Sequence, residues 1–131
     1  MADLSCTEFQ GAVSEYLVRH RSILDVMSKF QEAGARVNRA VAKSVTTCGC
    51  LEVSAKRQKF PEDADLADLR RLVDSHVYGE LCPDCAEALE AEIGQTMFYT
   101  AALCAVMGLD MSEIMVKEYD RLRMLGLFNL T

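Results

Sequence analysis

Positions 82–108 read CPDCAEALEAEIGQTMFYTAALCAVMG and predict the longest helix of the chain. Proline at the first helical position costs no hydrogen bond, so the helix begins at Cys82-Pro83, and Gly108 ends it. Between Thr96 and Val106 the segment is apolar on nearly every face. We therefore expect this helix to lie at the centre of the fold or to be shared with a second subunit.

Four more helices are predicted where apolar residues recur at helical spacing, at about 7–19, 23–45, 65–78 and 110–124. The expected N-caps are Ser5, Ser22 and Asp65. Gly79 is suited to end the helix that begins at Asp65. Between 46 and 61 the pattern breaks, and we expect an ordered loop with at most a small hairpin. The predicted fold class is all-α, a bundle of about five helices in a single domain, residues 1–131.

The composition limits the class of protein. The chain has 131 residues, half of them hydrophobic, which is enough to build one core. Its formal net charge of −6 argues against general nucleic-acid binding. The longest apolar run, 97–109, is too short to span a bilayer, and the first ten residues do not read as a secretory signal. We expect a cytoplasmic protein that does not enter membranes.

Four of the six cysteines form two close pairs, Cys48-Gly49-Cys50 and Cys82-Pro83-Asp84-Cys85. In the cytoplasm such pairs indicate metal ligands or redox thiols rather than disulfides. Zinc prefers four thiolates at tetrahedral corners, and each pair supplies two of them. Cys85 falls in the first turn of a helix, where the dipole is expected to lower the thiol pKa. We predict one structural zinc ion on Cys48, Cys50, Cys82 and Cys85, which closes an insertion at 46–85 between core helices.

Two other interpretations of these cysteines stay open. The four could be buried free thiols, which protein cores tolerate. Cys104, inside the apolar run, is predicted to be such a thiol. Cys82-x-x-Cys85 at a helix N-terminus also resembles a thiol redox motif. Such motifs usually follow a strand of a parallel sheet, which no pattern here predicts. A thiol redox or metal-sensing module is therefore a further hypothesis.

The segment from Glu92 to Leu103, followed by Met107-Gly108-Leu109-Asp110, resembles the second half of the MazG-like all-α nucleoside triphosphate pyrophosphohydrolases. In that family an E-x-x-D motif lies at the start of a buried helix. A Gly-Ile/Leu-Asp turn and a last helix follow. Positions 30–37, FQEAGARV, lie where the family carries E-E-x-x-E, and Glu8-Phe9-Gln10 resembles its first helix. With its Thr-Cys-Gly-Cys and Cys-x-x-Cys elements the chain also resembles bacterial proteins that carry the same elements, which implies a divergent, zinc-binding bacterial branch of the family. The resemblance implies a MazG-like helical bundle, a homodimer and a nucleotide ligand.

The departures from the family motifs concern its catalytic ligands. The family's carboxylates bind Mg²⁺, which binds the nucleotide phosphates. Carried over, Glu32 and Glu92 keep the character of ligands, whereas Ala33, Arg36 and Gln95 replace carboxylates. An arginine in such a cluster repels the metal and can pair with Glu32, four residues earlier. The resemblance thus implies degenerate catalytic residues, Glu32 and Glu92, with Arg36 and Gln95 as ligand-binding residues.

Two functions follow from the resemblance. The first is a nucleotide-binding or regulatory protein that no longer hydrolyses its ligand. The alternative is an active, Mg²⁺-dependent pyrophosphohydrolase that adds Glu87 or Glu90, which share a helix face, to Glu32 and Glu92. A basic stripe, Arg36, Arg39 and Lys43, could grip a phosphate-bearing ligand without metal. For Glu87, Glu90 and the basic stripe alike, a solvated helix face is the simpler interpretation.

Overall fold

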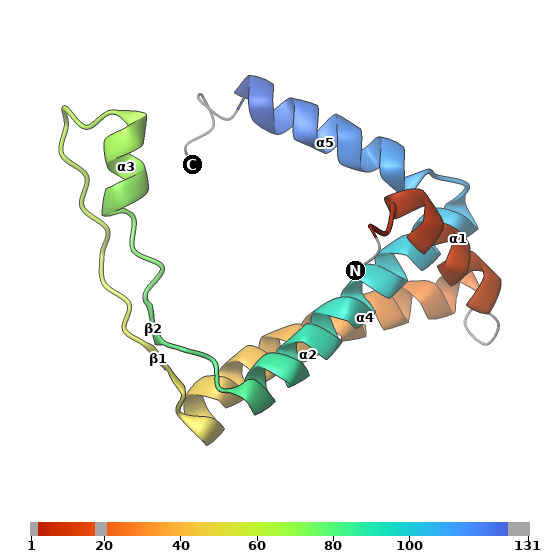
Figure 1. Ribbon diagram of the computed structural model, residues 1–131, viewed down its shortest axis with the longest axis horizontal. Helices are drawn as coiled ribbons and strands as arrows, with labels where there is room; N and C mark the ends of the chain where they lie inside the picture. The colour runs from red at the N-terminus through yellow and green to blue at the C-terminus, as the bar shows by residue number, and fades with distance from the viewer. Residues whose placement is uncertain (1–2, 18–20, 126–131) are drawn as a thin grey trace.

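The computed structural model describes residues 3–17 and 21–125. Its helices are α1 Cys6–Tyr16, α2 Ile23–Lys43, α3 Leu66–Leu72, α4 Pro83–Met107 and α5 Met111–Leu125 (Figure 1). A π-helical turn, η1 Ser44–Cys48, follows α2, and a small antiparallel sheet pairs β1 Leu51–Val53 with β2 Val77–Gly79. The predicted all-α class is confirmed, with the small sheet as its one departure among the described residues.

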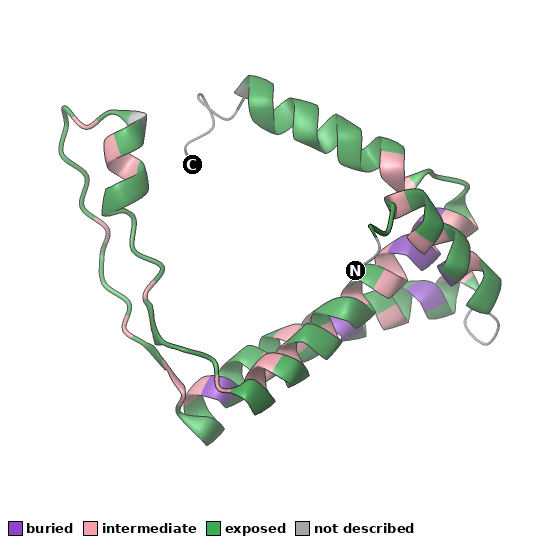
Figure 2. Ribbon diagram, in the orientation of Figure 1, coloured by how far each residue is buried: buried purple, intermediate pink, exposed green. Residues whose placement is uncertain are grey.

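The body of the molecule is the antiparallel pair α2 and α4, with α1 packed across one end (Figure 1). The core lies at that end, as the buried segments in Figure 2 show. Its fully or nearly fully buried members are Val13, Leu17, Val26, Ala101 and Ala102. Helix α4 therefore has the central position that its apolar sequence predicts. Two adjacent alanines let the helices approach closely at this point, because little side chain separates the backbones.

We expect Ala102→Leu to lower the free energy of unfolding by about 1–3 kcal/mol, because the fully buried alanine has no space for the added carbons. Ala91→Leu on the same helix is the matched control. Ala91 is exposed, so this change should stay within about 0.5 kcal/mol of the parent. Urea titration of both variants measures the difference. Equal stabilities would show that the α1–α2–α4 contact is not close-packed.

The helix ends largely follow the predicted signals. The Ser5 hydroxyl accepts from the Glu8 N–H at 3.0 Å, and Asp65 forms a capping box with Asp68. Cys82 and Pro83 begin α4, and Gly108, at a φ of 70°, ends it in the left-handed region. Ser22 occupies the N-cap of α2, although its side chain makes no capping hydrogen bond.

The third helix is shorter than predicted. It ends at Leu72 rather than Tyr78, and Val77 and Tyr78 belong to strand β2. There Tyr78 pairs with Glu52, and the turn before the strand is held by the Asp74 carboxylate, which accepts from the Tyr78 hydroxyl at 2.6 Å. The prediction was wrong because helical spacing continues past Leu72, while the strand partner that overrides it lies far away in the sequence.

The remaining boundary differences are small. Helix α2 ends at Lys43 rather than Val45, because the chain widens into η1 at that point. Arg19, the expected end of the first helix, lies outside the described residues.

One side chain ties the N-terminal helix to the turn between α4 and α5. The Gln10 amide donates to the Leu109 carbonyl at 2.7 Å and accepts from the Met111 N–H at 2.8 Å. Two hydrogen bonds from one amide fix the orientation of α1 against this turn. Helix α5 leaves from the turn and contacts α1 (Figure 1).

Two parts of the molecule project from the α2–α4 body. Residues 51–81, here called the arm, run out from the end opposite α1 and carry β1, α3 and β2 (Figure 1). Helix α5 projects from the other end. The chain exposes 10361 Å², whereas a compact monomer of 14.6 kDa exposes about 6,900 Å². The isolated chain is therefore much more open than a single globular domain.

Among the described residues, no single helix has the length and apolar character needed to cross a membrane. Helices α4 and α5, up to Met124, meet the criteria of length and composition only as a pair, bent by 111°.

Candidate metal centre and adjoining cavities

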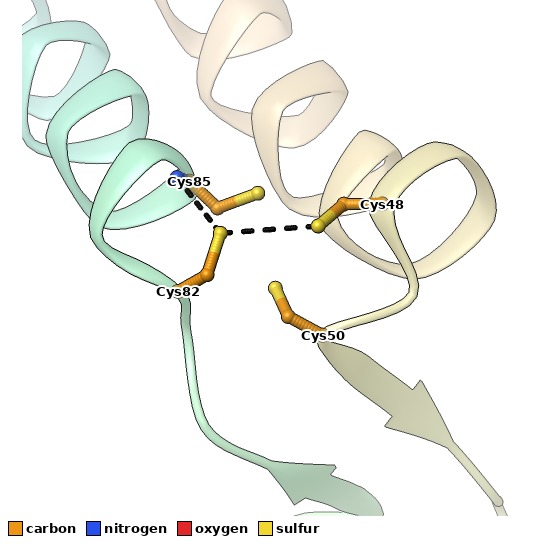
Figure 3. A group of neighbouring side chains, drawn as sticks. All are labelled: Cys48, Cys50, Cys82 and Cys85. Atoms are coloured by element: carbon orange, nitrogen blue, oxygen red, sulfur yellow. Dashed lines mark hydrogen bonds between the residues drawn. The ribbon is translucent and has the colours of Figure 1, made fainter.

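The four paired cysteines meet where the arm joins the body (Figure 3). Cys48 is the last residue of η1, and Cys50 directly precedes β1. Cys82 is the N-cap of α4, and Cys85 lies in its first turn. Their four Sγ atoms all lie within 4.8 Å of one another. The structure thus brings together the four residues that the sequence predicts as ligands.

The spacing of the sulfur atoms fits a tetrahedral metal site. A tetrahedron of thiolates with zinc–sulfur bonds of about 2.3 Å has edges of about 3.8 Å. The Sγ atoms of Cys48 and Cys82 are 3.8 Å apart, and a disulfide would bring them to about 2.05 Å. All six cysteines are free thiols. The cluster can therefore hold a metal ion, and a set of four thiolates is one that zinc accepts.

Glycines make the turns that bring the two pairs together. Gly49, between the first two ligands, has a φ of 82°, and its N–H donates to the Ser44 carbonyl at 2.9 Å. Gly79, at a φ of 93°, lies in β2 rather than at the end of a helix. A Cβ atom there would lie 2.5 Å from the Cys50 carbonyl oxygen, so only glycine lets the strand pass so close.

Ser44 supports the cluster from the α2 side and is a residue that sequence reasoning missed. It is 1% exposed, its hydroxyl donates to the Ala40 carbonyl at 3.0 Å, and its carbonyl accepts from the Cys50 thiol at 3.8 Å. A single serine at the end of a helix gives no sequence signal for this role. The π-helical turn that begins at Ser44 aims both Cys48 and Cys50 at α4.

The pKa pattern of the metal-free thiols differs from the expectation for Cys85. The Cys85 N–H donates to the Cys82 sulfur at 3.4 Å, and this hydrogen bond is the main cause that lowers the pKa of Cys82 to about 7. The contact of Cys85 with Ser44 favours its thiolate, but hydrogen bonding to Cys82 and burial outweigh it and raise the pKa of Cys85 to about 12. Cys82 is thus the first thiol of the cluster to ionise as the pH rises, because the backbone N–H of Cys85, in the first turn of α4, donates to its sulfur.

A cavity of about 270 Å³ between α2 and α4 gathers the four residues singled out by the family resemblance. They are Glu32, Arg36, Glu92 and Gln95, and Lys29, Ala33 and Tyr99 complete the lining. We call this the carboxylate cavity. Glu87 and Glu90, the further magnesium ligands of the alternative hypothesis, do not line it and are exposed.

The two carboxylates of this cavity have different surroundings. Glu32 accepts from Lys29 at 3.2 Å and from Arg36 at 3.3 Å, and these two cations, Lys29 foremost, lower its pKa. The Oε2 atom of Glu92 is buried and has no hydrogen-bond partner. Glu32 is therefore already neutralised by cations, whereas Glu92 has an acceptor that a ligand could satisfy. Lys29 was not among the residues predicted for this site.

A second cavity, of about 380 Å³, continues from the first toward the cysteines, and Arg36 and Glu92 border both. Arg39 and Lys43 line it from α2, Asp84 lines it from α4, and Cys48 and Cys85 lie at its end. We call this the bipolar cavity. The remaining cysteines lie elsewhere: Cys104 is buried, as predicted, and Cys6 is in α1.

Comparisons of the chain with protein-family models, with curated proteins and with solved structures find no match.

Proposed function

We propose that this chain is a zinc-stapled helical protein of MazG-like architecture that binds a nucleotide without hydrolysing it and works as a homodimer. The observation that carries the proposal is the carboxylate cavity. It joins Glu32, Arg36, Glu92 and Gln95 from two facing helices, and the four-cysteine cluster lies just beyond the adjoining bipolar cavity. A regulatory or sensing role suits a protein with a binding site and weakened catalytic residues.

The zinc ion has a structural role in this proposal. Four thiolates fill all tetrahedral positions, so no position is left for water or substrate, as a catalytic zinc requires. The ligands come from η1, from the residue before β1 and from the start of α4. When bound, the ion would hold both ends of the arm against the α2–α4 body.

The order of elements supports the MazG-like architecture. A long helix with Glu32, an insertion, a second long helix with Glu92, a turn at Gly108 and a last helix follow one another as the family resemblance implies. Glu32 and Glu92 face a common cavity, as residues that act on one ligand must.

The charges in the carboxylate cavity argue for binding without hydrolysis. Mg²⁺ needs carboxylates that are free to face it, and here Glu32 is held by two cations. Arg36 also places a positive charge where the metal would lie. These same cations can face phosphate oxygens directly, since arginine pairs well with phosphate. Lys29 and Arg36 would thus take over the charge neutralisation that magnesium supplies in an active enzyme.

We expect nucleoside triphosphates to bind without magnesium and to remain intact. Isothermal titration of a nucleotide panel measures binding, and a pyrophosphate-release assay with Mg²⁺ measures turnover. Arg36→Gln should weaken binding about tenfold, because one charge-assisted contact to phosphate is lost. Arg121→Gln is the control: this arginine is also exposed and paired with a glutamate of its own helix, but it lies in α5.

Two results would reject this proposal in different ways. Mg²⁺-dependent pyrophosphate release that disappears in Glu92→Gln would establish the active hydrolase instead. Failure of every nucleotide to bind would reject nucleotide binding and leave only the zinc site of this proposal.

A thiol redox function is favoured by one observation, the lowered pKa of Cys82, since thiolates are the reactive form. A redox pair needs only Cys82 and Cys85, but Cys48 and Cys50 belong to the same cluster. The metal site therefore accounts for more of the structure. Redox chemistry would require release of the metal first, because a thiolate bound to zinc is not free to exchange.

The homodimer is supported by the exposed surface. The chain exposes about 3,400 Å² more than a compact monomer of its mass, which exceeds the roughly 1,000–2,500 Å² that each partner of an obligate dimer typically buries. Helix α5 shows where this surface lies. Met115, Tyr119 and Leu122 form one stripe along it, and all three are more than half exposed. An amphipathic helix with its apolar face in solvent is not stable alone, so a second copy is the proposed cover.

A further inference from the structure

The bipolar cavity carries opposite charges on opposite walls. Arg36, Arg39 and Lys43 line it from α2, and Asp84 and Glu92 line it from α4. Among the described residues, neither Arg39 nor Lys43 forms an ion pair, and no ion pair crosses this cavity. Arg36 pairs with Glu32 of its own helix, whereas Arg39 and Lys43 face the acidic wall with no ion pair of their own in the described part of the chain.

One atom of the α4 wall is an unsatisfied acceptor. The Oε2 atom of Glu92 is buried and has no hydrogen-bond partner, whereas buried acceptors in proteins are almost always satisfied. Because Glu92 borders the cavity, a rotation of its side chain would turn this oxygen toward a ligand with an N–H donor at this wall. Asp84, also on this wall, adds a second carboxylate for a positively charged donor.

The α2 wall suits a phosphate. Arg39 and Lys43 are four residues apart, so they follow one another on one helix face, about 6 Å apart along the axis. A guanidinium and an ammonium group so placed can both reach a phosphate that lies between them. The cavity volume of about 380 Å³ lies in the range of small-molecule sites. A bare phosphate would leave the acidic wall without a partner.

We propose that the bipolar cavity binds a small zwitterion, a phosphorylated amine, with its phosphate on Arg39 and Lys43 and its ammonium group on Asp84 and Glu92. This site is separate from the proposed nucleotide site in the carboxylate cavity, although Arg36 and Glu92 border both. The zwitterion would lie next to Cys48 and Cys85, which also line this cavity. Ala40 and Ala88, which also line the cavity, offer apolar contacts to the carbon chain between the two charges.

The test is an isothermal titration of the zinc-loaded, full-length protein with O-phosphoethanolamine as the probe, in the absence of magnesium. Ethanolamine and inorganic phosphate each carry one of the two charges and serve as comparison ligands. We expect O-phosphoethanolamine to bind at least about tenfold more tightly than either, because both walls are engaged only by the zwitterion. Inorganic phosphate that binds as tightly as O-phosphoethanolamine would overturn the proposal.

Charge variants locate the site. Arg39→Gln with Lys43→Gln should weaken O-phosphoethanolamine binding about tenfold or more, and Asp84→Asn should weaken it by a smaller factor. The control is Arg57→Gln with Lys59→Gln, which makes the same change in net charge on the exposed arm. Zinc content is measured for every variant. Affinity of the Arg39/Lys43 variant equal to that of the control would show that these cations do not bind the probe, and loss of zinc from this variant would show that they serve the thiolates instead.

The Arg39→Gln/Lys43→Gln variant separates the two cavities, because Lys29 and Arg36 of the carboxylate cavity are unchanged in it and would still hold a probe that bound there. Nucleotide binding that fails while O-phosphoethanolamine binds would reject the proposed function and keep this site. The reverse pair of results would reject this site and keep the proposed function.

Discussion

Replacing Cys82 with serine is expected to remove the metal ion and to lower the melting temperature by about 15 °C. The reason is that the metal binds the folded cluster and hardly binds the unfolded chain, so its affinity adds directly to stability. Cys82 is the best choice because it is both a ligand and the N-cap of α4. Its sulfur accepts from the Cys85 N–H, and the serine hydroxyl can keep this cap. The loss therefore reports the metal rather than the helix end.

Plasma mass spectrometry of the native protein should give one zinc per chain, and the variant should give almost none. Cys6→Ser is the matched control, because Cys6 is partly buried, as Cys82 is, but lies outside the cluster. It should keep both the zinc and the melting temperature. Native protein that is purified under reducing conditions and contains no zinc would refute the metal centre and bring the thiol redox function forward.

The second large effect is expected at helix α5. Changing Tyr119 and Leu122 together to glutamate should raise the dissociation constant of the dimer by about a thousandfold or more. The two side chains are exposed in the isolated chain and lie on the apolar stripe with Met115. In a symmetric dimer each substitution acts twice, and charges buried in an apolar interface add a cost of desolvation.

Lys117→Glu provides the control for charge. It changes the net charge by the same amount as the double substitution, but Lys117 lies on the opposite side of α5 from the stripe. Sedimentation at micromolar concentration should show the parent and Lys117→Glu as dimers, and the double variant as a monomer with less helix. A parent protein that sediments as a monomer would refute the dimer outright.

The four-cysteine cluster and the central helix could be predicted from sequence because their signals are local. Each cysteine pair spans a few residues, and Pro83 and Gly108 mark the ends of α4 through their own backbone preferences. No such signal marks strand β2. Val77 is extended because Val53 pairs with it, and that contact joins segments that the sequence separates. The helical spacing of Leu69 and Val73 therefore misled the prediction beyond Leu72.

The carboxylate cavity could be predicted only in part. The family resemblance pointed to Glu32, Arg36, Glu92 and Gln95, and the structure places all four around one hollow. The pairing of Arg36 with Glu32 was predicted from their four-residue spacing and is observed. The contact of Lys29 with Glu32, on the preceding turn, was not predicted. Surface pairs at this spacing are common and weak, so sequence alone gives no reason to select this one.

The hydrogen bonds of Gln10 have a consequence for how the chain folds during synthesis. This residue leaves the ribosome well before its partners, Leu109 and Met111, which lie about a hundred residues later in the chain. At typical elongation rates of about 5–20 residues per second, helix α1 waits about 5–20 s for the turn that receives it. The cysteine cluster and the α2–α4 pair can form in that interval. Helix α1 is thus made well before the turn that receives it, and in the meantime its apolar face is what a chaperone would meet on the nascent chain.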